Sequence, residues 1–148
     1  MLNFVAPNDF DAVINMFYSF GFFETDDENE KVLSNFFDSL KVGGKFLMHT
    51  DVNIPRILSG KYKINEIRTL QNGSKLRIID QFDERTKRVE VSWTFDGVQK
   101  DYSVRVYTKE EFESLCLKVG FQNVQAYSNW NGDYYSEDSE DMIVVGTK

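Results

Sequence analysis

Apolar positions in the first third of the chain fall into two short runs separated by a helical stripe. The runs predict strands over about 12–16 and 46–50, of the kind buried in parallel sheets. Between them, residues 27–41 repeat apolar side chains at helical spacing, and Gly43 or Gly44 supplies a left-handed cap. Strand, helix and strand joined by short connections predict a parallel crossover unit.

The middle of the chain changes to period-two alternation, as in Arg77-Ile78-Ile79-Asp80. This pattern is typical of an antiparallel sheet with one solvated face. Glycine- and aspartate-containing turns separate the candidate strands. The strands are expected at 61–70, 75–82, 89–95 and 102–107.

A second helix and two further strands are expected after residue 107. Thr108 and Glu111 have the spacing of a capping box, and Gly120 follows the apolar stripe as a C-terminal cap. Strands are predicted at 124–127 and 142–146, with a polar, aromatic loop between them.

Composition narrows the classes of function. The 148 residues carry a formal net charge of -7, which argues against nucleic-acid binding and suits a cationic small molecule. Cys116 is the single cysteine, so no intrachain disulfide forms. There is no apolar run of membrane-spanning length, no signal-peptide pattern and no metal-ligand spacing. We expect a cytoplasmic protein with no membrane or nucleic-acid partner.

Several segments, in this order, resemble parts of class I S-adenosylmethionine-dependent methyltransferases of the small-molecule type. They are Phe10–Ile14 with the loop 17–21, Leu40–Phe46 (L-K-V-G-G-K-F), Tyr107–Glu111 with Val119-Gly120-Phe121, and the final strand 142–148. The resemblance implies an α/β fold containing the last four strands of a partial Rossmann-like methyltransferase sheet, with an inserted antiparallel β-sheet. The implied parts of this single partial domain (1–148) are a strand-helix-strand core (1–53), the inserted sheet (54–107), and the last helix with two strands (108–148).

The resemblance covers only the C-terminal half of that family. The family's glycine-rich loop and the acidic residue that binds the cofactor ribose have no counterpart in this chain, whose nine glycines include no G-x-G triplet. We therefore expect weak or absent binding of S-adenosylmethionine by this chain alone. We also expect a homo-oligomer or a separate N-terminal half as partner, because the first of the two parallel strands would otherwise leave an open edge.

Candidate site residues follow from the resemblance and from strand-end positions. Asn15, Met16 and Phe17 end a parallel strand, where open α/β sheets bind their ligands, and would contact S-adenosylmethionine. Tyr18 and Phe20 would line an aromatic pocket for a small-molecule acceptor. The alternative for all five is ordinary core and loop packing.

The remaining candidates lie at the next strand end and in the last loop. His49 is the only histidine and could serve as general base, although a lone histidine is more often structural. Asp51, Asn53 and Trp130 could contact the acceptor, with solvated loop residues or a protein interface as the alternative.

Three functions remain open from the sequence. The first is a methyltransferase, or part of one, acting on a small-molecule acceptor and incomplete for catalysis as this chain alone. The second is a noncatalytic methyltransferase-like remnant that binds a partner or self-associates. The third is a module that binds a small molecule through its aromatic pocket alone.

Overall fold

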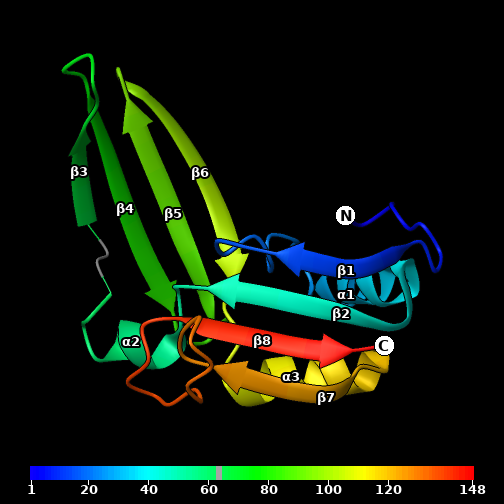
Figure 1. Ribbon diagram of the computed structural model, residues 1–148. Helices are drawn as coiled ribbons and strands as arrows, with labels where there is room; N and C mark the ends of the chain where they lie inside the picture. Colours follow the sequence, from blue (N-terminus) through cyan, green and yellow to red (C-terminus); the bar gives the residue numbers. More distant parts are fainter. Residues whose placement is uncertain (63–64) are drawn as a thin grey trace.

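The computed structural model describes residues 1–62 and 65–148, which form two four-stranded sheets (Figure 1). The first sheet has the order β1 (Phe10–Asn15), β2 (Leu40–Thr50), β8 (Met142–Thr147) and β7 (Gln122–Tyr127). The second has the order β3 (Asn65–Thr69), β4 (Lys75–Asp83), β5 (Arg88–Phe95) and β6 (Val98–Arg105). The helices are α1 (Asp26–Ser39), α2 (Ile54–Leu58) and α3 (Lys109–Val119). The mixed α/β class predicted from the sequence is confirmed.

The β1-α1-β2 unit is the predicted parallel crossover. Residues Ala12 to Asn15 pair in parallel register with Lys45 to Met48. Thr25 begins α1 with a capping box, since its side chain accepts from the Glu28 amide while Glu28 bonds back to the Thr25 amide. The local signals for this unit therefore agree with its tertiary pairing.

The predicted end of α1 at residue 41 is wrong by two residues, because the helix ends at Ser39. The predicted glycine cap at Gly43 or Gly44 is also wrong. The helix stops at Ser39 because Leu40, fully buried in the core, turns directly into the extended conformation of β2. Gly43 has φ +80° and lies inside β2, where the pairing with β1 shifts register. Its conformational freedom serves a bulge in the strand rather than a helix end.

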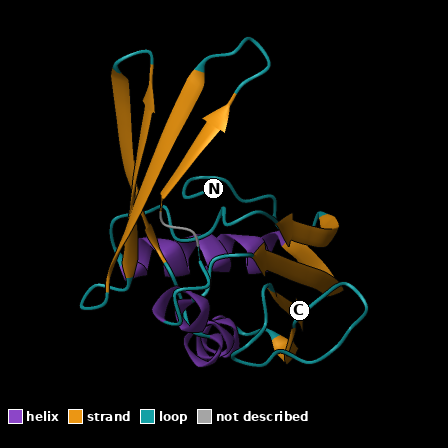
Figure 2. Cartoon of the chain, turned by 90° about the vertical axis from the view of Figure 1, so that its left-hand side faces the viewer, coloured by secondary structure: helices purple, strands orange, loops and turns teal. Residues whose placement is uncertain are grey.

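Helices α1 and α3 lie on the same face of the first sheet (Figures 1 and 2). The core between them is built from inward-facing side chains of the helices and of β2 and β8, and its aromatic rings pack stacked, tilted or edge to face. Fully buried members include Leu33, Leu40, Phe46, Phe112 and Val144. This layer holds the ends of the parallel strands in place.

The opposite face is open at β1, which forms one edge of the sheet. Ile14 on that strand is 65% exposed, and Phe10 is also exposed. The N-terminal residues bond to the end of α1 instead of pairing with β1, since the Asn8 and Asp9 amides donate to the carbonyls of Asp38 and Ser39. Within the described residues, β1 pairs with β2 alone.

The inserted sheet is antiparallel throughout, as expected, and projects away from the helix layer (Figure 2). Its strands agree with the predicted ones to within a few residues, except that the first begins at Asn65, and 63–64 of the expected 61–70 lie outside the described residues. A second apolar cluster joins this sheet to the end of the first through Val52, Ile54, Ile78 and Val89.

Helix α2 differs from the sequence prediction, which gives only the inserted sheet over residues 54–107. Asn53 caps it by accepting from the Arg56 amide, and Pro55 occupies its first turn. This Asn-x-Pro signal was present in the sequence, but one turn of helix has too little periodicity to stand out.

The C-terminal part follows the prediction closely. Thr108 and Glu111 form the capping box of α3, and Gly120 ends the helix with φ +120°. Strand β8 runs antiparallel to both β2 and β7. No helix in the described part of the chain is long and apolar enough to cross a membrane.

Candidate functional site

The carboxyl ends of the parallel strands β1 and β2 lie side by side at one end of the first sheet. The backbone directly after β1 is strained. Phe17 and Tyr18 have φ values of 55° and 58°, so two consecutive non-glycine residues adopt the left-handed conformation. Such strain persists only where surrounding contacts fix it, and it is often found at ligand sites. Here the Phe17 amide donates to Nδ1 of His49, and the Tyr18 amide donates to the His49 carbonyl oxygen.

His49 forms the centre of an aromatic cluster at this edge. It is 6% exposed, with Phe17 edge-on at 5.7 Å and Trp130 tilted at 5.3 Å between ring centroids. Its Nε2 lies 3.3 Å from a carboxylate oxygen of Asp141. Both ring nitrogens are therefore engaged, which fixes the imidazole and through it the loop after β1. The general-base role stays a prediction, and it would require the Phe17 amide to leave Nδ1.

The structure brings Phe17, His49 and Trp130 together from three separate segments. Phe17 is 77% exposed and Trp130 is 60% exposed, so their rings offer open apolar faces. Trp130 lies in the β7–β8 loop, which Ser128, Asn129 and Asp133 close through backbone and side-chain hydrogen bonds. The loop is thus ordered beside the strand ends.

Asn15 and Met16 lie directly before the strained residues. Asn15 is buried, and its Nδ2 contacts the Met1 sulfur at 3.9 Å. Its Oδ1 is buried without a hydrogen-bond partner in residues 1–62 and 65–148. A buried amide oxygen of this kind suits a donor group of a ligand. The Met16 carbonyl accepts from the Ser19 hydroxyl, which tightens the loop.

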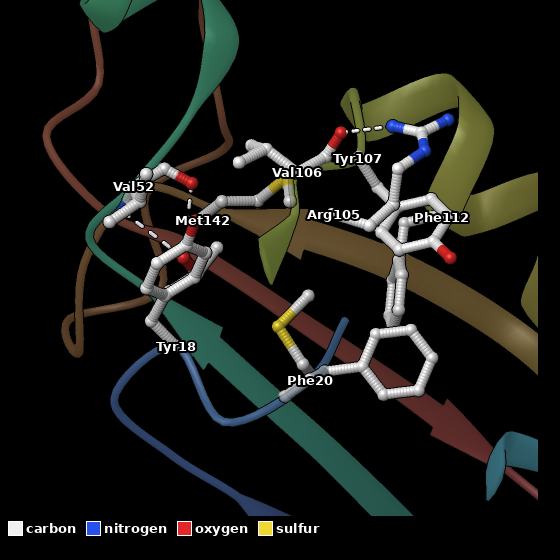
Figure 3. A pocket seen from close by; sticks show the side chains of 10 residues that line it. Tyr18, Phe20, Val52, Arg105, Val106, Tyr107, Phe112 and Met142 are labelled. Atoms are coloured by element: carbon white, nitrogen blue, oxygen red, sulfur yellow. Dashed lines mark hydrogen bonds between the residues drawn. The ribbon is translucent and has the colours of Figure 1, made fainter. Parts of the chain in front are cut away.

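Tyr18 and Phe20 do line a common cavity, but it measures about 20 Å³, enough for roughly one water molecule. Figure 3 shows Tyr18 beside Val52 at one end and Phe20 toward Phe112 at the other. The Phe20 and Phe112 rings pack edge to face at 5.3 Å, and Phe20 is 5% exposed. This placement favours core packing for Phe20 over a position in an acceptor pocket.

Asp51 and Asn53 differ in their surroundings. Asn53 is 1% exposed, and besides capping α2 its Nδ2 donates to the carbonyls of Ser139 and Glu140. Both polar atoms of its side chain are thus used to join α2 to the last loop, which favours a structural role. Asp51 is exposed and lines a cavity of about 370 Å³ between α2 and the inserted sheet.

That cavity contains a group the sequence did not reveal. Asp80 on β4 is 8% exposed, and its Oδ2 accepts from the Tyr62 hydroxyl at 2.7 Å. Burial raises the pKa of the Asp80 carboxyl, and the nearby Glu66 charge adds to this, while the Tyr62 hydrogen bond opposes it. Burial and the charge of Asp80 also raise the pKa of Tyr62 and of Tyr18.

Period-two alternation puts Asp80 on the same face of β4 as the buried Ile78, two residues earlier, because alternate side chains point the same way. A polar residue in phase with apolar ones on a strand was the available signal. The residues that interact with Asp80 are Tyr62, which follows α2, and Tyr18, which lies in the loop after β1. Both are distant from Asp80 in the sequence.

Among solved structures, the chain is similar to S-adenosylmethionine-dependent methyltransferases. One from Clostridium acetobutylicum ATCC 824 has a TM-score of 0.75 and 16% identity, and the match covers 98% of this chain and 61% of that one. The CcbJ methyltransferase from Streptomyces caelestis has a TM-score of 0.72 and 14% identity, covering 95% and 57%. The amino pentose methyltransferase CalS10 from Micromonospora echinaspora, solved with the cofactor bound, has a TM-score of 0.62 and 16% identity, covering 99% and 61%.

These similarities define the fold: it is the one found in S-adenosylmethionine-dependent methyltransferases. The chain spans about 60% of the length of these structures. No protein-family model and no curated protein sequence matches it. The Rossmann-like fold class inferred from motif order is therefore confirmed.

Proposed function

We propose that this chain forms the acceptor side of an S-adenosylmethionine-dependent methyltransferase that acts on a small molecule. The observation that carries the proposal is the cluster of Phe17, His49 and Trp130 at the joint end of two parallel strands. In open α/β sheets this edge is where ligands bind. Structural neighbours with the same fold include enzymes of this activity.

When bound, S-adenosylmethionine supplies an electrophilic methyl group that needs little activation. Asn15 and Phe17 fit a contact with it, because one offers an unpartnered buried oxygen and the other an exposed ring. His49 positions the loop after β1 through its bond to the Phe17 amide. Trp130 lies beside His49 at the same strand ends and would cover one side of an acceptor held there.

A methyl-transfer assay tests this function. The sample is the chain preceded by whatever its gene encodes directly upstream, and the donor is methyl-labelled S-adenosylmethionine offered with amino sugars. We expect Phe17→Ala to lower kcat/KM by about tenfold, as for loss of one positioning contact. Phe95→Ala is the matched control, since Phe95 is partly exposed at the far end of β5.

The assay also has a clear negative result. If this sample transfers no methyl group and the upstream sequence lacks a glycine-rich strand end, the proposed methyltransferase function is contradicted. It would leave the binding module as the better account.

The open edge of β1 supports that second candidate, a noncatalytic module that pairs with another chain. Strand β1 presents Phe10 and Ile14 to solvent and carries no proline or lysine to block pairing. Light scattering over a range of concentrations tests it. A dimer, or a complex with a separate N-terminal half, is expected, and Ile14→Lys should weaken either. A monomer at every concentration would rule out self-association through β1.

A further inference from the structure

Asp141 places a carboxylate against the ring of His49. It stands directly before β8, whose first residues Met142 and Ile143 pair with Thr50 and His49. Its Oδ1 lies 3.3 Å from Nε2 of His49. The Asp141 side chain is 31% exposed and the His49 side chain 8% exposed, so the contact is largely shielded from solvent on the histidine side. The place of this carboxylate is therefore set by the pairing of β2 with β8.

The other side of the same ring determines which nitrogen carries the proton. The Phe17 amide donates to Nδ1 at 3.4 Å, so Nδ1 must offer its lone pair. A neutral imidazole has one protonated and one unprotonated nitrogen, and the proton is therefore on Nε2. There it faces Asp141, whose carboxylate is a charge-assisted acceptor. Both contacts thus require the same tautomer of His49.

The Phe17 amide links this histidine to the strained loop. Phe17 and Tyr18 both have positive φ, a conformation that persists only where surrounding contacts maintain it. His49 supplies two of these contacts, one through Nδ1 and one through its carbonyl oxygen, which accepts from the Tyr18 amide at 3.3 Å. The carbonyl is held in β2, whereas the ring can rotate about its side-chain bonds unless a second group holds it. The hydrogen bond to Asp141 holds the ring.

We propose that Asp141 is a positioning residue for Phe17. It holds His49 as the neutral tautomer protonated on Nε2, and Nδ1 of that tautomer fixes the loop after β1. This inference rests on the proposed function for what Phe17 touches, whereas the chain of contacts itself needs no ligand. It assigns His49 to positioning rather than to general-base catalysis, because the Phe17 amide occupies its one lone pair. A proton released by an acceptor at these strand ends would then pass to water.

Nitrogen NMR of the His49 ring measures the tautomer directly. The sample is the ¹⁵N-labelled chain without an added histidine tag, at pH 8, where an ordinary imidazole is neutral. His49 is the only histidine, so its ring signals are identified without further assignment. We expect the shift of an unprotonated nitrogen at Nδ1 and of a protonated nitrogen at Nε2. A proton on Nδ1 would overturn the proposal, whether or not the chain takes part in methyl transfer.

Asp141→Asn tests whether the carboxylate sets this tautomer. An amide can donate to Nε2, which moves the proton to Nδ1 and breaks the bond from the Phe17 amide. We expect hydrogen exchange at the Phe17 amide to become about tenfold faster, as for loss of one charge-assisted hydrogen bond. Asp138→Asn is the matched control, because that side chain lies in the same loop, is 91% exposed and pairs with Lys61 instead. No acceleration in Asp141→Asn, or the same acceleration in both variants, would contradict the assignment.

His49→Asn separates positioning from proton transfer. Its Oδ1 can take the place of Nδ1 and accept from the Phe17 amide, but a side-chain amide does not act as a base. Slow exchange of the Phe17 amide should therefore persist in His49→Asn and be lost in His49→Leu. If the two variants exchange equally fast at Phe17, the bond to Nδ1 does not hold the loop and the proposal fails.

Discussion

At the scale of single residues, the buried carboxylate of Asp80 is a group that folding disfavours at neutral pH. A buried carboxylate with one hydrogen bond is poorly solvated when ionised, which is why burial raises its pKa. A carboxyl whose folded-state pKa is raised contributes stability below its unfolded pKa of about 3.9 and loses that contribution as pH rises through the folded value. Folding thus retains an unfavourable charge at neutral pH.

Asp80→Asn should therefore change the free energy of unfolding more favourably at pH 7 than near pH 3, because it removes the unfavourable charge only where the carboxyl is ionised. The amide keeps the oxygen that accepts from Tyr62 but carries no charge. Urea denaturation at both pH values measures the difference. Asp101→Asn should shift the other way, because hydrogen bonds from Ser92 and Gln99 lower the pKa of the Asp101 carboxyl. The same pH dependence in both variants would contradict this account of Asp80.

Burial of a single helical leucine gives a second residue-scale prediction. Leu33 on α1 is fully buried, whereas Leu117 on α3 is 59% exposed. Leu33→Ala should lower the free energy of unfolding by about 2–5 kcal/mol through lost burial and an unfilled cavity. Leu117→Ala, the same change on an exposed helix face, should stay within about 0.5 kcal/mol. Chemical denaturation followed by circular dichroism compares them, and equal losses would mean that α1 does not pack as described.

At the scale of elements, the loop after β1 is fastened to β6 at one glycine. Gly21 has φ +99°, and a Cβ on it would lie 2.2 Å from the Arg105 carbonyl oxygen. The Arg105 amide also donates to the Gly21 carbonyl at 2.8 Å. This close approach joins the candidate site on the first sheet to the inserted sheet, and only glycine permits it.

Gly21→Ala should be more destabilising than Gly132→Ala. Both glycines have positive φ, so both variants pay about 1–2 kcal/mol of backbone strain, but Gly132 has open space around its Cβ position. The clash at Gly21 should add about 1–3 kcal/mol. Thermal unfolding measures the two side by side. Equal effects would show that the loop and β6 are not in contact.

Element type and order could be predicted from the sequence because they depend on local patterns. The capping box at Thr108 and the alternation over residues 75–105 are examples. The end of α1 could not, since it is set by burial of Leu40 against distant strands. The Asp80 group was missed for the same reason, because its chemistry arises only when β4 packs beside the loop after β1.

At the scale of the whole molecule, helices cover one face of the first sheet, and the other face is exposed at β1 among the described residues. Helices α1 and α3 cover the first, while Ile14 remains exposed on the second. The chain also spans only about 60% of the structures it matches. We propose that this chain alone binds the methyl donor weakly or not at all.

Calorimetric titration with S-adenosylhomocysteine tests this central inference most directly. Two samples are compared: the chain itself, and the chain preceded by whatever its gene encodes directly upstream. The account predicts no saturable low-micromolar binding by the chain alone and clear binding by the longer protein. Low-micromolar binding by the chain alone, or none by the longer protein, would contradict it.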